Sequence, residues 1–332
     1  MNKTYLITGG AGFIGSAMVR RLVSDPKNCV INIDKLTYAS NRKSLEKVEE
    51  RENYFFYKND ICDYKELINI FLKHSPDVVM HFAAESHVDR SINEPQSFLT
   101  TNIMGTYNLL EICREHFKKK SFIFHHVSTD EVYGDIEENK PSVEHDPYLP
   151  SSPYSASKAA SDHLVRAWHR TYQLPILITN CSNNYGPYQN YEKLIPKVII
   201  NLINNVEIPI YGKGNQIRDW IYVDDHIEGI LKVINKGKIG ETYNLGGNNE
   251  IKNIDLVNQI IEIMININGG TDEDLIQKRK LIKFVTDRPG HDQRYSINSS
   301  KAEQIGWIRR GNFADNLKKT VEWFINNYQI KQ

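Results

Sequence analysis

The chain has 332 residues, of which 40% are hydrophobic and 25% are charged. This length and composition suit a globular protein with a large core, and they exclude small disulfide-stapled, fibrous and wholly disordered classes. The 41 Lys and Arg residues balance the 41 Asp and Glu residues, so no global charge attracts the chain to nucleic acid or to an anionic membrane.

Short apolar runs alternate with helix-length periodic segments through the first half of the chain. Strands are expected at residues 4–8, 29–33, 54–58, 78–82, 122–127 and 176–180, and helices at residues 14–23, 64–73, 102–117 and 155–172. Strands that are apolar throughout indicate a parallel sheet with helices on both faces. Right-handed crossovers then favour a Rossmann-type, doubly wound α/β fold.

The pattern changes after about residue 180, where segments rich in Asn, Gly and Pro alternate with short helices. We expect an NAD-binding Rossmann domain at residues 1–180 and a smaller C-terminal α/β substrate domain at residues 181–332. The segments Trp220–Tyr222 and Glu241–Leu245 could rejoin the first domain, so that residues near 220–245 would interleave the two domains.

The cysteines and the apolar runs bear on compartment. Cys29, Cys62, Cys113 and Cys181 lie far apart without zinc-type spacing, which predicts free thiols, a reducing compartment and no metal site. No apolar run approaches the ~18 residues that a membrane span needs, and no secretory signal pattern precedes the first strand. A cytoplasmic location is expected.

A glycine array follows the first expected strand, with Gly9, Gly12 and Gly15 at intervals of three. Glycine lets the backbone turn tightly and approach a pyrophosphate, and the start of the next helix offers N–H groups and a positive dipole. A purely structural turn would also explain three glycines. The position between a strand and a helix favours a dinucleotide site.

Acidic residues follow the next two expected strands. Asp34 closes the second, where a carboxylate can accept both adenosine ribose hydroxyls and would repel a 2′-phosphate, so NAD is favoured over NADP. Asp60 and Ile61 after the third are placed to contact the adenine, which is a weaker signal. In both places, the alternative is an acidic residue at the end of a strand that is exposed to solvent and binds no ligand.

Tyr154 and Lys158 are four residues apart and share one face of an expected helix. A phenol titrates near ~10, and a neighbouring ammonium together with the nicotinamide cation would favour its ionised form. Thr129, at the end of a strand, is followed by Asp130 and Glu131. Adjacent carboxylates in a desolvated cleft do not both ionise easily, which suits an acid and a base, although an acidic surface pair is the alternative.

Together these motifs resemble the extended short-chain dehydrogenase/reductase family, also known for NAD-dependent epimerases and dehydratases. The segments His81–Asp89, Ser128–Gly134, Asn180–Pro187 and Asp287–Asp292 are similar to those of its nucleotide-sugar 4,6-dehydratases, and the resemblance runs from Tyr5 to about Trp323. It implies a lyase with tightly bound NAD that converts dTDP-glucose to dTDP-4-keto-6-deoxyglucose for deoxysugar biosynthesis of the dTDP-rhamnose type. A 4-epimerase, a UDP- or CDP-sugar 4,6-dehydratase and a cofactor-sensing binding protein remain alternatives.

The resemblance also implies a role for each catalytic candidate. Tyr154 would take the proton of the C4 hydroxyl, Thr129 would hydrogen-bond the sugar, Glu131 would abstract the C5 proton and Asp130 would protonate the departing C6 hydroxyl. Lys158 would bind the nicotinamide ribose and lower the pKa of Tyr154. Further expected cofactor contacts are Phe13, Ile14, Lys35, Leu36, Thr37, Ala83, Ala84, Ser86, Thr101 and Asn184.

A nucleotide sugar carries two phosphate charges, for which Arg218 and Arg288 are candidates because a guanidinium fork suits phosphate oxygens. An ion pair with the neighbouring aspartate is the alternative for each. The resemblance implies further substrate contacts at Ser86, His87, Thr129, Asn183, Glu192, Lys193, Leu194, Pro209, Ile210, Tyr211, Asn253 and His291, of which Tyr211 or His291 would lie against the base. His87 is expected as a pocket residue and not as a catalyst. A homodimer through the helices at 102–117 and 155–172 is also implied.

Overall fold

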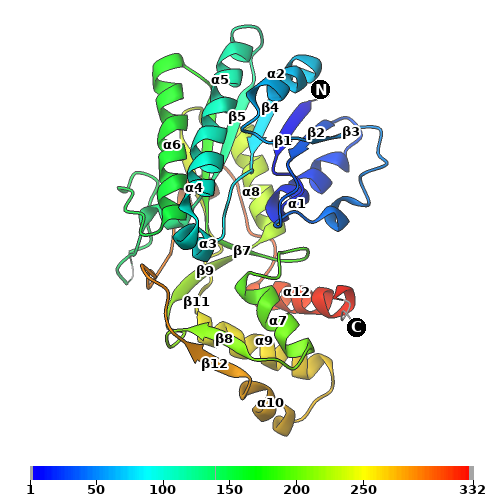
Figure 1. Cartoon of the computed structure of the whole chain (residues 1–332), viewed down its shortest axis with the longest axis vertical. Coiled ribbons are helices and arrows are strands. Elements are labelled where there is room, and N and C mark those ends of the chain that lie inside the picture. Colours follow the sequence, from blue (N-terminus) through cyan, green and yellow to red (C-terminus); the bar gives the residue numbers. More distant parts are fainter. Residues whose placement is uncertain (1–2, 139, 329–332) are drawn as a thin grey trace.

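The computed structural model describes residues 3–138 and 140–328, so the outer ends of the two predicted domains, residues 1–2 and 329–332, lie outside the described residues. A larger α/β body forms the upper part of the molecule in Figure 1. A smaller body lies below it and contains β8 (Ile208–Tyr211), α10 (Asp272–Arg279) and β12 (Ile282–Val285). Within residues 3–138 and 140–328, no helix combines the length and apolar character that crossing a membrane requires.

The larger body is built on a seven-stranded parallel sheet with the order β10-β6-β5-β4-β1-β2-β3. Its strands are β1 (Thr4–Thr8), β2 (Cys29–Asp34), β3 (Tyr54–Lys58), β4 (Val78–His81), β5 (Ile123–Thr129), β6 (Ile176–Cys181) and β10 (Thr242–Leu245). The strand order reverses between β1 and β4, and ligands of open α/β sheets bind beyond the carboxyl ends of the strands at such a point. The predicted Rossmann-type fold is confirmed.

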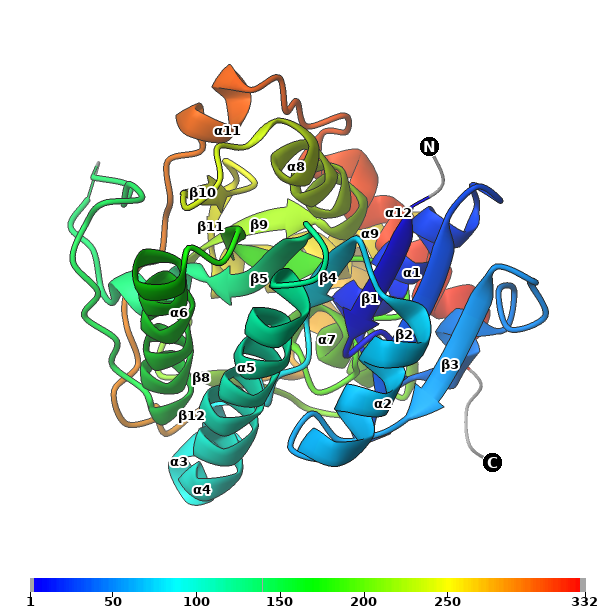
Figure 2. The ribbon, with the colours of Figure 1, turned by 90° about the horizontal axis from the view of Figure 1, so that it is seen from above.

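Helices cover both faces of this sheet, as Figure 2 shows from above. On one face lie α2 (Tyr64–His74), α5 (Thr106–Phe117) and α6 (Pro153–Tyr172), and on the other lie α1 (Phe13–Val23) and α8 (Val223–Lys236). Leu6 of β1 packs into the first layer, whereas its neighbour Ile7 packs into the second, and both are fully buried. Burial on both faces is why these strands lack polar alternation.

Short elements complete the larger body. They are the 3₁₀ turns η1 (Arg42–Leu45) and η3 (Asp130–Tyr133), the helices α3 (Val88–Asn93), α4 (Pro95–Phe98) and α11 (Ser300–Gln304), and the π-helical η2 (Leu99–Gly105). The helix predicted at residues 102–117 therefore begins in η2 and becomes regular only at Thr106.

Helix α6 starts at Pro153, two residues earlier than predicted. Ser152 caps it, because the Ser152 hydroxyl accepts from the backbone N–H of Ser155 at 3.0 Å and the Ser155 hydroxyl accepts from the N–H of Ser152 at 3.0 Å. Proline fits the first helical position, where no N–H is needed. This reciprocal cap sets the register that places Tyr154 in the first turn and Lys158 one turn later.

The smaller body has a three-stranded sheet, β11-β9-β7, and a parallel pair, β12-β8. The strands are β7 (Asn183–Tyr185), β8 (Ile208–Tyr211), β9 (Ile217–Tyr222), β11 (Glu250–Lys252) and β12 (Ile282–Val285), and the helices are α7 (Leu194–Ile203), α9 (Asn253–Ile267), α10 (Asp272–Arg279) and α12 (Phe313–Asn327). Apolar side chains of α7, α9 and α12, including Ile199, Ile260 and Val321, form a separate core.

Of the two segments predicted to rejoin the first domain, one joins the large sheet and the other does not. Thr242–Leu245 does so as β10 beside β6, after α8 has packed on the large sheet. Trp220–Tyr222, in contrast, belongs to β9 in the three-stranded sheet. The carboxylate of Asp219 accepts the N–H groups of Gly247 at 2.7 Å and Asn249 at 2.6 Å, and this turn brings β11 against β9. The division at residue 180 remains a prediction.

Candidate active site

Gly9 and Gly15, at the turn between β1 and α1, leave no room for a side chain. Gly9 has φ +73°, and a Cβ there would lie 2.6 Å from the backbone nitrogen of Ala83. A Cβ on Gly15 would lie 2.2 Å from the carbonyl oxygen of Gly9. Gly12 precedes the first turn of α1, where no side chain caps the helix and no acidic residue lies. The N–H groups of this turn are therefore suited to an anion.

Asp34 is held at the end of β2 by three donors. Its Oδ2 accepts the N–H of Ala11 at 2.9 Å, and its Oδ1 accepts the N–H of Leu36 at 2.8 Å and the hydroxyl of Ser40 at 2.9 Å. A carboxylate has about four lone-pair positions, so acceptor capacity is left on Oδ2 for a ribose hydroxyl. Lys35 lies 3.3 Å from Asp60, and both side chains are half-exposed.

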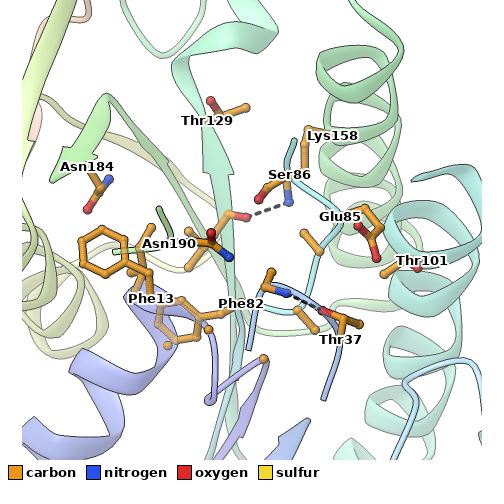
Figure 3. Close-up of a pocket in the computed structure, with 18 of the residues that line it drawn as sticks. Phe13, Thr37, Phe82, Glu85, Ser86, Thr101, Thr129, Lys158, Asn184 and Asn190 are labelled. Carbon is orange, nitrogen blue, oxygen red and sulfur yellow. Dashed lines mark hydrogen bonds between the residues drawn. The ribbon is translucent and has the colours of Figure 1, made fainter. Parts of the chain in front are cut away.

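One cavity runs along the carboxyl ends of the large sheet and into the smaller body. Figure 3 shows side chains from separate elements around it: Phe13 from α1, Thr129 at the end of β5, Lys158 from α6 and Asn184 from β7. Of the predicted cofactor residues, those that line the cavity are Gly9, Gly12, Phe13, Ile14, Gly15, Asp34, Lys35, Thr37, Asp60, Ile61, Ala83, Ala84, Ser86, Thr101, Tyr154, Lys158 and Asn184. Leu36 does not line it. That residue has φ +61°, and its backbone N–H orients Asp34 instead.

Several lining residues were missed by sequence reasoning. They are Ile33, Ala39, Ser40, Asn59, Phe82, Glu85, Val127, Ser128, Cys181, Ser182, Gln189, Asn190 and Trp220. Most of them are sequence neighbours of a predicted motif at the end of a strand. Their position beside a strand end was the signal that could have identified them. Gln189 and Trp220 belong to the other body and had no such signal, because only tertiary packing brings them here.

The five predicted catalytic residues also line this cavity. Thr129 ends β5, Asp130 and Glu131 follow in η3, and Tyr154 and Lys158 come from α6. The hydroxyl of Thr129 donates to Asp130 Oδ1 at 3.2 Å and accepts the N–H of Glu131 at 3.3 Å. Asp130 Oδ2 and Glu131 Oε2 are buried and have no hydrogen-bond partner among the described residues. Such atoms are costly in a fold and are expected where a ligand supplies the partner.

The surroundings of Asp130 and Glu131 shift the pKa values of the two carboxyl groups to different extents. Burial, then the neighbouring Glu131 and Asp219, raise the pKa of Asp130 well above its usual range. Burial also raises the pKa of Glu131, but Arg288, Arg218 and Lys193 oppose that rise. A proton is therefore held more tightly by Asp130, and the negative charge is better tolerated on Glu131.

Tyr154 and Lys158 are both buried, and burial opposes the charged form of each. It raises the pKa of Tyr154 well above the usual value, with a further rise from Glu131 and a lowering by the hydrogen bond with Thr129. Burial lowers the pKa of Lys158, whose ammonium donates to the carbonyl oxygen of Val127 at 2.8 Å. The resemblance implied that Lys158 lowers the pKa of Tyr154. Among the chain's own groups, burial and Glu131 outweigh any such effect, and the pKa of Tyr154 is raised.

Neither candidate phosphate ligand forms the ion pair that was its alternative role. The guanidinium of Arg218 is buried, donates to the carbonyl oxygen of Asp292 at 2.9 Å and lies 4.3 Å from the ring centre of Tyr295. Arg288 lies 3.5 Å from Asp89 of the larger body. Each guanidinium is thus oriented by contacts other than the aspartate beside it in the sequence.

The predicted substrate residues fall into two groups. Ser86, Thr129, Asn183, Glu192, Lys193 and Leu194 line the cavity described above. His87, Pro209, Ile210, Tyr211, Arg218, Asn253, Arg288 and His291 lie outside its lining. Within the second group, the ring of His291 lies 6.0 Å from that of Tyr211, and the Tyr211 hydroxyl donates to Asp89 of the larger body at 2.9 Å.

Residues of the smaller body contact α3 and the strand end before it. Lys193 donates to the carbonyl oxygen of Ser86 at 2.9 Å. His87 accepts the N–H of Arg90 at the start of α3, and its Nε2 lies 3.7 Å from Glu192. Burial, then Lys193, lower the pKa of His87 to about 4, so the ring is neutral at physiological pH.

The described residues hold no group of three or more His, Cys, Asp or Glu side chains that could bind a metal ion. All four cysteines are free thiols, as predicted. The cavity lining brings together a phenol, an ammonium and two adjacent carboxyl groups beside a dinucleotide-type turn.

Comparisons with known proteins find relatives over nearly the whole chain. The family model described as GDP-mannose 4,6 dehydratase matches residues 6–320. The chain is 52% identical over 342 residues to dTDP-glucose 4,6-dehydratase 1 of Escherichia coli strain K12, covering 97% of this chain and 92% of that protein.

Two solved structures have the same architecture. The dTDP-glucose 4,6-dehydratase of Bacillus anthracis, in complex with NAD, is 40% identical with a TM-score of 0.87, and the match covers 98% of this chain and 97% of that one. The DesIV enzyme of Streptomyces venezuelae, a dTDP-glucose 4,6-dehydratase with NAD bound, is 42% identical with a TM-score of 0.88 and the same coverage.

Proposed function

Because the chain belongs to the family described as GDP-mannose 4,6 dehydratase, we propose that it removes water from dTDP-glucose to form dTDP-4-keto-6-deoxyglucose. It is a hydro-lyase that uses NAD and serves deoxysugar biosynthesis. The observation that carries this function is the convergence of Asp130, Glu131 and Tyr154 on the cavity that the glycine turn also lines. An epimerase has no use for the two acids, whereas loss of water needs a base for C5 and an acid for the C6 hydroxyl.

The residues present fit NAD. The tight contacts at Gly9 and Gly15 exclude side chains where a pyrophosphate would approach the backbone, and the first turn of α1 faces that place. Asp34 would hold the adenosine ribose and Lys158 the nicotinamide ribose. The Ser128 hydroxyl, which has no hydrogen-bond partner within residues 3–138 and 140–328, is a further polar group at the lining. When bound, NAD supplies a hydride acceptor for C4 of the sugar and the hydride donor for C6.

The chain's own residues move the protons. Tyr154 accepts the proton of the C4 hydroxyl in its ionised form, which burial and Glu131 oppose in the chain alone and which the nicotinamide cation of bound NAD would favour. Thr129 hydrogen-bonds the sugar. Oxidation at C4 makes the C5 hydrogen acidic, and Glu131 removes it as a base. Asp130, whose raised pKa keeps it protonated, donates its proton to the C6 hydroxyl, which leaves as water. Glu131 then returns a proton to C5.

One turnover changes the protonation of both Tyr154 and Asp130. Tyr154 has gained the proton of the C4 hydroxyl, and Asp130 has lost one to the departing water. A proton must therefore pass from Tyr154 to Asp130, directly or through solvent, before the next cycle. The hydroxyl of Thr129 contacts both groups and supports such a return.

The smaller body would hold the nucleotide. Arg218 and Arg288 would contact the diphosphate, and both also lower the pKa of Glu131. Tyr211 and His291, which pack edge-to-face, would flank the base. Asn183, Glu192 and Lys193 line the cavity toward the sugar.

The decisive experiment is mass spectrometry of the product after the purified protein is incubated with dTDP-glucose. We expect a product lighter by one water and no net consumption of added NAD. An isomer of unchanged mass would indicate a 4-epimerase, and water loss only from UDP- or CDP-glucose would identify a different nucleotide preference. Absence of reaction with the whole panel, from protein that retains NAD, would leave the binding-protein alternative.

We also propose a homodimer through η2, α5 and α6. The outer face of these helices exposes apolar groups, with Met104 51%, Tyr107 38% and Tyr172 41% exposed. The Trp168 ring lies 6.0 Å from that of Tyr107 and 5.7 Å from that of Tyr172, which makes the face continuous. Light scattering should give twice the chain mass, and Tyr107→Glu should give the monomer. A monomeric parent protein would refute the dimer.

A cytoplasmic location is supported by the four free thiols, which suit a reducing compartment. Cell fractionation with an antibody against the chain is the direct measurement. Recovery in the membrane or secreted fraction would contradict it.

A further inference from the structure

Three charged side chains alternate in sign along the buried side of α6. Lys158, Asp162 and Arg166 are spaced four residues apart, so they follow one another on the same helical face. Lys158 is 4% exposed and Asp162 is fully buried. A carboxylate with no exposure is stable as an anion only when paired and hydrogen-bonded. Asp162 does not itself line the cavity, so its burial is not explained by direct contact with a ligand.

His126 of β5 connects the carboxylate to the catalytic lysine. Its Nε2 lies 3.1 Å from Asp162 Oδ1 and 3.4 Å from the Nζ of Lys158. Burial, then Lys158, lower the pKa of His126 to about 4, so the ring is neutral at physiological pH. A neutral ring does not balance the charge of Asp162. The cations on either side of Asp162 along the helix must do so.

The second oxygen of Asp162 is fixed by Tyr148. The Tyr148 hydroxyl donates to Asp162 Oδ2 at 2.9 Å and accepts from Arg166 at 2.7 Å and from Asn180 at 3.1 Å. These contacts hold the carboxylate still without neutralising it. Its charge therefore remains available to Lys158, one helical turn closer to the cavity.

We propose that Asp162 is a positioning residue: it is the buried counter-ion that keeps the ammonium of Lys158 charged and directed at the cofactor cavity. The proposal rests on the proposed function only in giving Lys158 a role in catalysis. Asp162 acts through Lys158 and would touch neither NAD nor the sugar. Neutralising it should make the ammonium easier to deprotonate, while the fold of α6 is retained.

Other ionisable groups face this pair from each neighbouring element. Within α6 these are Tyr154 and Arg166, from β5 His126, from β4 His81 behind the His126 ring, from β6 Cys181, and from the preceding loop Tyr148. Burial lowers the pKa of His81 well below its usual range and raises that of Cys181 to about 12. Both are therefore neutral through the physiological range, and Asp162 is the carboxylate among these groups that faces Lys158.

The first test is the pH profile of kcat/KM for Asp162→Asn. Loss of the anion lowers the pKa of Lys158, so the alkaline limb should move to lower pH by about one unit, with about tenfold less activity on that limb. At lower pH, where Lys158 is still charged, activity should approach that of the parent. Asp225→Asn removes another buried carboxylate, on α8, and should leave the limb in place. An unshifted limb in Asp162→Asn, or one shifted equally in the control, would overturn the proposal.

A measurement on the unmodified protein covers the case in which Asp162→Asn does not fold, and it does not depend on dehydration. Lysines labelled with ¹³C at Cε are titrated by NMR, and Lys158→Arg identifies the Lys158 signal by its disappearance. We expect Lys158 to keep its proton throughout the physiological range. Loss of that proton below neutral pH would show that Asp162 does not sustain the charge. If the signal behaves as expected but no dehydration occurs, the proposed function fails and this proposal stands.

Discussion

Replacing Glu131 by glutamine should separate oxidation at C4 from loss of water. The change keeps the size of the side chain but removes the only carboxylate of the adjacent pair that the surroundings favour as an anion, because the pKa of Asp130 is raised further. Asp130 therefore cannot take over as the base. A positioned general base contributes roughly 10²–10⁴-fold, so kcat should fall by that factor.

The assay is rapid mixing of Glu131→Gln with dTDP-glucose, followed by the absorbance of reduced nicotinamide. Oxidation at C4 requires Tyr154 and not Glu131, so we expect the absorbance to rise and persist while no dehydrated product forms. Exchange of the C5 hydrogen with deuterium from the solvent should be lost to a similar extent. Glu66→Gln, on the exposed start of α2, makes the same chemical change outside the cavity and should behave as the parent.

Two results would refute this reasoning. Normal turnover by Glu131→Gln would mean that another group removes the C5 proton. Failure to accumulate reduced nicotinamide, in protein that still binds substrate, would mean that Glu131 is needed already for oxidation at C4.

The remaining predictions concern the phenol, the glycine turn, the phosphate site and pH. Tyr154→Phe should lose both oxidation and elimination, at least 10²-fold, with no rise in nicotinamide absorbance; product formation near the parent rate would contradict its role as base. Gly15→Ala would place a Cβ 2.2 Å from the backbone carbonyl oxygen of Gly9. Overpacking of this kind costs about 1–3 kcal/mol of folding stability. Calorimetry should therefore show weaker NAD binding and a lower Tm than in the parent protein. Arg288→Lys removes a planar fork that suits phosphate; titration with dTDP should give about tenfold weaker binding, and unchanged affinity would exclude Arg288 as a diphosphate ligand. Burial lowers the pKa of His125 and His226 to about 3 in the folded chain, against ~6.5 when unfolded. The unfolded chain therefore binds more protons below pH ~6.5, so the free energy of unfolding should fall by about 1.4 kcal/mol per pH unit for each histidine as the pH decreases toward the folded pKa. Urea titrations at several pH values test this slope, and a flat profile would contradict it.

The predicted dinucleotide half of the site depends on local features of the sequence. The spacing of Gly9, Gly12 and Gly15 after an apolar run depends on backbone sterics within a single strand–turn–helix unit, and the structure shows the clashes that side chains would meet there. The four-residue spacing of Tyr154 and Lys158 likewise places both on one face of α6, whatever surrounds that helix. The apolar runs of the first half predicted the sheet, because burial on both faces removes polar alternation.

Long-range contacts decided what the sequence left open. Whether Arg218 and Arg288 pair with the adjacent aspartates depended on where Asp89 and Asp292 lie, far away in the chain. The placement of Trp220 in a second sheet depended on a turn held by the preceding carboxylate. Charge balance in a buried site depends on neighbours in space, so protonation could be assigned only after folding had set which groups lose water and which charges they meet.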